Sequence, residues 1–160
     1  MKNVSKLFAY LKVMCILLLA TPLLQSCATS NATTTLSNGV DITKYRYVVF
    51  GDMDKGDAEL DDIILEINNE ISFYLKEVNG SVALDLLNKG EHVLSPRVSV
   101  KTEKWDGGYT YMTISFFDFA TNKLVAVIKS KGQGLTISED QELAIKALRK
   151  ELDKRFLSNK

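Results

Sequence analysis

Five aspartates crowd one short stretch of the chain, and this group has the clearest capacity for metal chemistry. They are Asp52, Asp54, Asp57, Asp61 and Asp62. Carboxylates at such density can bind calcium or magnesium. The calcium-loop pattern fails, however, because Gly56 occupies a ligand position and Ile63 stands where the loop requires glutamate. We therefore predict no metal site here and interpret Asp61 and Asp62 as the acidic first turns of a helix.

His92 is the single histidine, and no motif around it makes it a catalytic base. A Gly-x-Ser-x-Gly elbow does not occur, and Gly132-Gln133-Gly134 is too short for a nucleotide-binding fingerprint, so we interpret it as a loop that breaks the sheet. We expect no cofactor and no catalytic residue. The alternatives are a tethered hydrolase or metal-dependent enzyme that uses His92 or the region from Asp52 to Asp62, and a small-ligand carrier.

The composition is typical of one globular domain. The chain has 160 residues, of which 46% are hydrophobic, enough to bury an apolar core. Its 20 basic and 20 acidic residues cancel. Because nucleic-acid-binding surfaces are strongly basic, this balance predicts no nucleic-acid partner.

The first segment has the pattern of a secretory signal. Lys2, Lys6 and Lys12 precede an apolar run over residues 13–24. That run is about 12 residues long, too short for the ~20 that a transmembrane helix needs. We therefore predict a signal peptide over residues 1–26.

Leu24-Gln25-Ser26-Cys27 resembles a bacterial lipobox, with leucine three residues before a cysteine and a small residue directly before it. The resemblance implies cleavage before Cys27 and acylation of Cys27, palmitate included, so that the protein is a lipoprotein of the cell envelope. We expect it in the outer membrane, facing the periplasm. A free thiol after ordinary cleavage is the alternative. Residues 27–40 are polar and uncharged and predict a flexible tether, followed by a single domain over residues 41–160.

Periodicity predicts the elements of that domain. Residues 45–50 form a strand, and an apolar stripe from Leu60 to Val78 predicts a helix that Asn79-Gly80 ends. A short helix over residues 81–88 follows. Three strands in a meander and a last helix complete the order β-α-(α)-β-β-β-α. We predict an α+β fold with two layers: a mainly antiparallel four-stranded sheet with two main helices on one face.

Turn length sets the register of the meander. A three-residue turn at Asp106-Gly107-Gly108 places Thr102 opposite Met112. A turn at Ala120-Thr121-Asn122 places Phe116 opposite Ala126 and Ile114 opposite Ile128. Ser138 and Gln141 have the spacing of a capping box that begins the last helix.

The stretch DFATNK over residues 118–123, taken with the strand at residues 47–50 and the capped last helix, resembles small envelope lipoproteins of the curli-secretion and penicillin-binding-protein-activator type. That resemblance implies an accessory domain without catalytic residues.

One side of the predicted sheet carries aromatic residues among charged ones. Trp105, Tyr111 and Phe117 lie on the side that the helices leave open. Aromatics among charges are typical of protein-recognition surfaces. We therefore expect a non-catalytic, lipid-anchored binding or assembly module, held to the membrane by Cys27 and bound through these three residues to another envelope protein.

Overall fold

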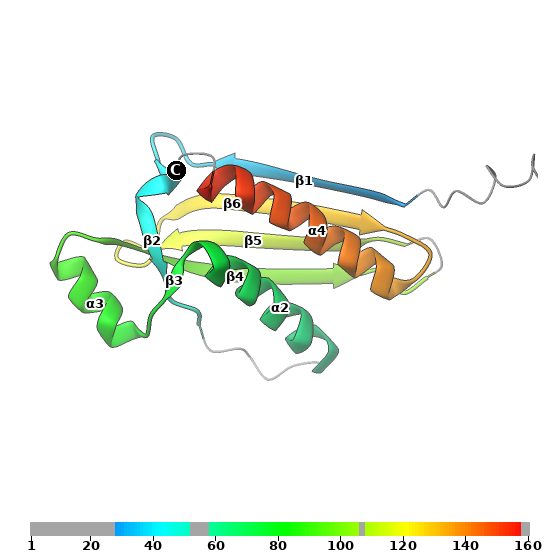
Figure 1. The fold of residues 1–160 in the computed structure, drawn as a ribbon, viewed down its shortest axis with the longest axis horizontal. Helices are drawn as coiled ribbons and strands as arrows, with labels where there is room; N and C mark the ends of the chain where they lie inside the picture. Colours follow the sequence, from blue (N-terminus) through cyan, green and yellow to red (C-terminus); the bar gives the residue numbers. More distant parts are fainter. Residues whose placement is uncertain (1–27, 52–57, 106–107, 158–160) are drawn as a thin grey trace, which may run out of the picture.

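The computed structural model describes residues 28–51, 58–105 and 108–157, which form an α+β fold with one six-stranded sheet (Figure 1). In chain order the elements are β1 (Thr29–Leu36), the 3-10 helix η2 (Ile42–Lys44), β2 (Tyr45–Val48), α2 (Ala58–Tyr74), β3 (Lys76–Glu77), α3 (Gly80–Asn88), β4 (His92–Thr102), β5 (Thr110–Asp118), β6 (Leu124–Gln133) and α4 (Ile137–Phe156). The strands lie in the order β1-β6-β5-β4-β2-β3.

The predicted α+β class is confirmed, whereas the strand count and order differ from the four-stranded prediction. The pairs β1–β6, β6–β5 and β5–β4 are antiparallel, and β2 is parallel to both β4 and β3. The two additional strands, β1 and β3, form the two edges of the sheet. Both come from segments that we expected to have other structures.

Strand β1 occupies the segment that we expected to be a flexible tether. It pairs with β6 over its full length, from Thr29 opposite Gln133 to Leu36 opposite Ala126. Leu36 packs against the core, and the Thr34 hydroxyl donates to the Glu151 carboxylate of α4 at 2.7 Å. The tether prediction is therefore wrong over this range, because threonine is polar but its β-branched side chain favours extended backbone.

The first long helix ends earlier than its apolar stripe predicts. Helix α2 ends at Tyr74, and the chain then forms β3 beside β2, where the Val78 N–H donates to the Val48 carbonyl at 2.9 Å. Asn79 does not close this helix. Its side chain accepts from the Val82 N–H at 2.9 Å and so caps the beginning of α3.

The β4–β5 register is shifted from the prediction, but the faces are the same. Thr102 lies opposite Thr110, and Val100 lies opposite Met112, because the connecting loop is longer than three residues. The shift is two residues, the repeat of side-chain direction in a strand, so each side chain keeps its face. The β5–β6 pairing is confirmed, including the turn at Asn122, whose φ is +53°.

Helices α2 and α4 lie on the same face of the sheet and bury it (Figure 1). The largest fully buried side chains come from these helices, from the residue that follows α2, and from the sheet residues beneath them: Phe116, Ile67, Ile71, Leu75, Leu94, Met112, Ile114, Ile128, Leu148 and Leu152. Between the helices, the Arg149 guanidinium pairs with the Glu70 carboxylate. Tyr74 also donates to Asp153 at 2.8 Å.

Helix α4 begins two residues before the predicted capping box. Thr136, not Ser138, accepts from the Glu139 N–H at 3.2 Å. The Glu139 carboxylate in turn accepts from the Leu135 N–H at 2.8 Å. The free backbone N–H groups at the start of α4 are thus bonded by a hydroxyl and a carboxylate, as in a capping box, but two residues earlier than predicted.

Gly132 brings helix α4 into direct contact with strand β6. A Cβ at this position would lie 2.2 Å from the Asp140 carbonyl oxygen and 2.5 Å from the Ala144 nitrogen. Gly132 and Gln133 belong to β6, so the prediction that Gly132-Gln133-Gly134 breaks the sheet is wrong for these two residues. The glycine is there because backbone packs against backbone.

Replacing Gly132 by alanine tests this contact. We expect Gly132→Ala to lower the free energy of unfolding by about 3 kcal/mol or more, because the added methyl group meets backbone atoms that cannot rotate away. Urea denaturation followed by circular dichroism measures the change. Gly80→Ala is the control: its Cβ meets nothing within 4 Å, and we expect a gain of about 0.5 kcal/mol. Equal effects of the two changes would contradict the packing described.

Candidate functional site on the open face of the sheet

Within the described residues, no element covers the middle of the sheet face opposite α2 and α4, which we call the open face. Figure 1 shows both long helices on one face and α3 beyond the end of the strands. Strands β1, β6, β5 and β4 direct alternate residues to this open face. These residues are therefore available to a partner.

Cationic side chains gather on the open face. They are Arg97 and Lys101 from β4, and Lys129 and Lys131 from β6, which we call the cationic strip. None of the residues that these four strands direct to this face is acidic, and Glu103 follows directly after β4. Since the whole chain has equal numbers of acidic and basic residues, this local excess is a property of the fold.

Aromatic rings lie among these cations. The Arg97 guanidinium lies 4.5 Å from the centroid of the Phe117 ring, and the Lys131 amino group lies 5.1 Å from that of Tyr109. Such cation–π contacts contribute about 0.5–1 kcal/mol each at exposed sites. Tyr111 lies on the same face, 38% exposed, and its ring centroid is 5.7 Å from that of Tyr109. The structure thus places Tyr111 and Phe117 on the predicted face, and their binding role stays a prediction.

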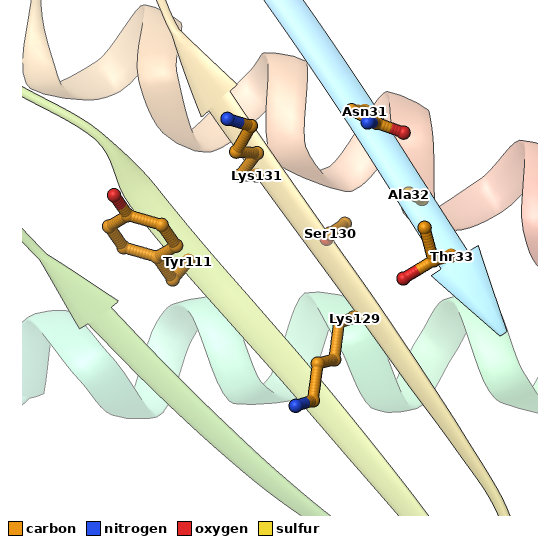
Figure 2. Close-up of a pocket in the computed structure, with 7 residues that line it drawn as sticks. All are labelled: Asn31, Ala32, Thr33, Tyr111, Lys129, Ser130 and Lys131. Atoms are coloured by element: carbon orange, nitrogen blue, oxygen red, sulfur yellow. The ribbon is translucent and has the colours of Figure 1, made fainter. Parts of the chain in front are cut away.

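A shallow pocket of about 230 Å³ lies within this strip (Figure 2). Asn31 and Thr33 from β1 border it on one side, and Tyr111 from β5 borders it on the other. Figure 2 shows the side chains of Lys129 and Lys131 extending from β6 on the Tyr111 side. Ammonium, amide and hydroxyl groups are the donors that bind a carboxylate or phosphate.

The Tyr111 hydroxyl stays protonated at neutral pH. Partial burial, the nearby Glu103 carboxylate and Tyr109 raise its pKa above the ordinary value. The group can therefore donate a hydrogen bond to an anionic ligand in this pocket.

The acidic cluster predicted from the sequence lies only partly within the described residues. Asp52, Asp54 and Asp57 lie outside them. Asp61 and Asp62 lie near the start of α2, as expected for an acidic helix terminus. Within the described ranges, histidine, cysteine and acidic side chains form no group of three that could hold a metal ion. The absence of a metal site in the whole chain stays a prediction.

His92 lies at the beginning of β4, beside two groups that hold a turn in place. Its ring centroid is 5.4 Å from that of Tyr45. Tyr45 donates to the Asp118 carboxylate at 3.0 Å, and the Thr121 N–H and hydroxyl donate to it at 2.8 and 2.7 Å. Burial raises the pKa of Asp118, but these hydrogen bonds outweigh it and hold the pKa below its ordinary value. Asp118 thus organises the β5–β6 turn.

Sequence reasoning missed part of the open face. Lys129 and Lys131 alternate with the inward residues Ile128 and Ser130, and this alternation could have assigned them to the face of Tyr111. Asn31 and Thr33 were missed because the polar composition of their segment resembles a linker, and the β propensity of its threonines does not show which strand it joins. Trp105 lies in the loop after β4 and is 61% exposed.

The lipid-anchor prediction concerns residues that the structure does not describe. Cys27 lies outside the described ranges. Within those ranges, no helix has the length and apolar character needed to cross a membrane.

Comparison with known proteins finds likeness in structure alone. No protein-family model matches the chain, and no curated protein matches it. A PelC dodecamer from Paraburkholderia phytofirmans is 14% identical over 80% of this chain and 99% of its own, with a TM-score of 0.50. A variant of that PelC is 15% identical over 79% of this chain and 98% of its own, with a TM-score of 0.46. The likeness to the first shows a shared α+β fold, and neither is one of the lipoprotein types that the DFATNK stretch resembles.

The Asp118 turn provides a pH-dependent test of this geometry. We expect Asp118→Asn to lower the free energy of unfolding by about 1 kcal/mol at pH 7, because three donors lose a charged acceptor. The pKa of Asp118 is lower in the folded protein than in the unfolded chain, so its charge stabilises the fold at pH values above the unfolded pKa. This stabilisation is lost as the pH falls through the pKa of the folded protein. The difference should therefore begin to narrow below about pH 4, the ordinary pKa of an aspartate, and close at lower pH.

Thermal unfolding between pH 2.5 and 7 measures this difference. Asp85→Asn, the same substitution at an exposed position of α3, is the matched control against which the gap for Asp118→Asn is read. A gap for Asp118→Asn that is the same at every pH would contradict the role of the carboxylate charge.

Proposed function

We propose that this protein is a non-catalytic, lipid-anchored binding or assembly module of the bacterial cell envelope. The observation that carries the proposal is the open face of the sheet, where the cationic strip and the rings of Tyr111 and Phe117 lie together. A face that combines apolar rings with cations can exclude water against a partner protein and select that partner by its charge. No enzyme chemistry is part of this proposal, because Asp118 holds the β5–β6 turn and the His92 ring packs beside Tyr45.

The partner is an envelope protein with an acidic surface. The four side chains of the cationic strip share their face with no acidic residue of the same strands, so they attract carboxylates at long range and repel basic partners. Tyr111 provides the flat apolar contact at which partner surfaces gain most binding energy. The pocket between Asn31, Tyr111 and Lys129 has room for one partner side chain, and its donors suit a carboxylate.

The lipid anchor is supported by the sequence. Leu24-Gln25-Ser26-Cys27 follows a charged and then an apolar segment, and acyl chains on Cys27 would hold the domain in the outer membrane. An anchored module meets its partner in two dimensions, which raises the effective concentration of both.

Removing the two outward rings tests the binding face. We expect Tyr111→Ser with Phe117→Ser to weaken partner binding at least tenfold while the protein folds, because both rings lie outside the core between sheet and helices. Cross-linking in native membranes identifies the partner, and titration of the purified pair measures the affinity. Unfolding of the double variant, or unchanged affinity, would refute the assignment.

Charge reversal separates the electrostatic part of the proposal. Lys129→Glu with Lys131→Glu should lower the association rate and its salt dependence. The matched control is Lys146→Glu with Lys150→Glu, which makes the same change of charge at exposed positions of α4. Equal effects of the two pairs would mean that net charge, and not the cationic strip, governs binding.

Cys27→Ala tests the anchor. We expect the variant to lose fatty-acid labelling and to leave the membrane fraction or persist as an uncut precursor, because one thiol carries the lipid attachment. Metabolic labelling with palmitate and mass spectrometry of the mature N-terminus measure both effects. An unlabelled wild-type protein would end the proposal of a lipoprotein.

A further inference from the structure

We propose that the end of the sheet at which β1 begins is held against the membrane surface, with Trp105 and Leu135 inserted among the lipid headgroups. The inference rests on the proposed lipid anchor at Cys27 and deepens it, because it assigns a membrane-contacting surface and an orientation of the domain. The occupant of this surface is a lipid bilayer.

The connection between the anchor and the fold is short. Strand β1 begins at Thr29, two residues after Cys27, and Thr29 already pairs with Gln133 of β6. Two extended residues span at most about 7 Å. A headgroup layer is of similar thickness, since the ~30 Å hydrocarbon core widens to about 40–45 Å with both headgroup regions. An acyl-bearing Cys27 therefore leaves the beginning of β1 no room to move away from the lipid surface.

Several connections meet at this end of the sheet. The register places the beginning of β1 beside the end of β6, and Gly132 of β6 beside Thr110 at the beginning of β5. Thr110 in turn pairs with Thr102 at the end of β4. Figure 1 shows these strand ends together on the right, where α4 also begins. Strands are ~4.8 Å apart, so β4 lies only about 14 Å across the sheet from β1.

The side chains exposed at this end suit a lipid interface. Trp105, in the loop after β4, is 61% exposed, and Leu135, between β6 and α4, is 69% exposed. Tryptophan and tyrosine are the residues enriched at membrane interfaces; Tyr109 directly precedes β5, and Tyr111 is its second residue. Lys101, Lys104 and Lys131 stand at this end together with the acidic Glu103, Glu139 and Glu142, and Asp106 follows Trp105 in the sequence. The exposed apolar side chains, and not a net positive charge, therefore suit this end to a lipid interface.

This placement sets the direction of the binding face. Because the strands run away from the membrane end, the open face stands upright on the bilayer. Phe117 is six residues beyond Tyr111 along β5 and so lies roughly 20 Å farther from the lipid surface. A partner on the open face would therefore approach from the side, parallel to the membrane.

Trp105 is the single tryptophan, so intrinsic fluorescence reports directly on this surface. The test uses the full chain processed in cells, purified and reconstituted into vesicles of phosphatidylethanolamine and phosphatidylglycerol at a ratio of 3:1. Acyl chains brominated near the headgroup quench only a tryptophan that reaches them. We expect brominated vesicles to remove at least half of the emission seen in unbrominated ones.

Moving the tryptophan to the other end of the sheet provides the matched control. Trp105→Phe combined with Leu124→Trp places the tryptophan at the first residue of β6, roughly 30 Å along that strand from its last residue. The native Leu124 side chain is 42% exposed, so a tryptophan there is accessible to lipid. We expect this variant to show less than a fifth of the quenching of the wild type. Inserting 12 glycine and serine residues between Ala28 and Thr29 should lower the wild-type quenching at least twofold. Circular dichroism checks that both variants fold.

The outcomes separate this inference from the lipid anchor. Mass spectrometry of the same sample reports whether Cys27 is acylated, and an unacylated Cys27 removes the anchor and this inference with it. With Cys27 acylated, absent quenching of Trp105, equal quenching at both ends or no effect of the insertion overturns the membrane-contacting surface alone. A blue-shifted emission without quenching also overturns it, since Trp105 would then be buried against a second copy.

Discussion

The close contact between α4 and β6 is the constraint on which the rest of the structure depends. At Gly132 the two backbones meet with no room for a side chain, and the Gly134 N–H donates to the buried carboxylate of Asp140. These contacts hold the helix across the sheet, so that Leu148 and Leu152 cover Phe116 and its neighbours. One face of the sheet is thereby buried, and the opposite face is left to carry polar and aromatic side chains.

That division connects the two proposals. The open face holds cations and rings because alternate strand residues must point away from the core, and nothing in the described part of the chain covers its middle. Strand β1 contributes twice. It adds Asn31 and Thr33 to the pocket, and it joins the sheet two residues after Cys27. A lipid anchor there would orient the domain, so membrane attachment and partner binding would be coupled by rigid geometry.

The errors of the sequence predictions have one physical origin. The polar threonines of residues 33–35 resemble a linker by composition, yet they form a strand because their backbone pairs with the edge of β6 that β5 leaves unpaired. The β4–β5 register was wrong by two residues because loop length, not strand pattern, sets it. Lys76 and Glu77 were predicted to be helical, but they form a strand because they pair with β2. In each case a partner distant in the chain overrode the local signal.

The sequence by itself determined which residues of β4, β5 and the two long helices face the core, because their apolar residues recur with a period of two in the strands and 3.6 in the helices. It also determined the turn at Asn122, because that residue tolerates a positive φ. The tertiary structure alone decided that β1 belongs to the sheet and that Lys129 and Lys131 flank Tyr111. It also decided that Trp105 lies at the same end as the first residue of β1. These relations join distant segments, and pairing between distant segments depends on the complementary edges that the folded chain presents.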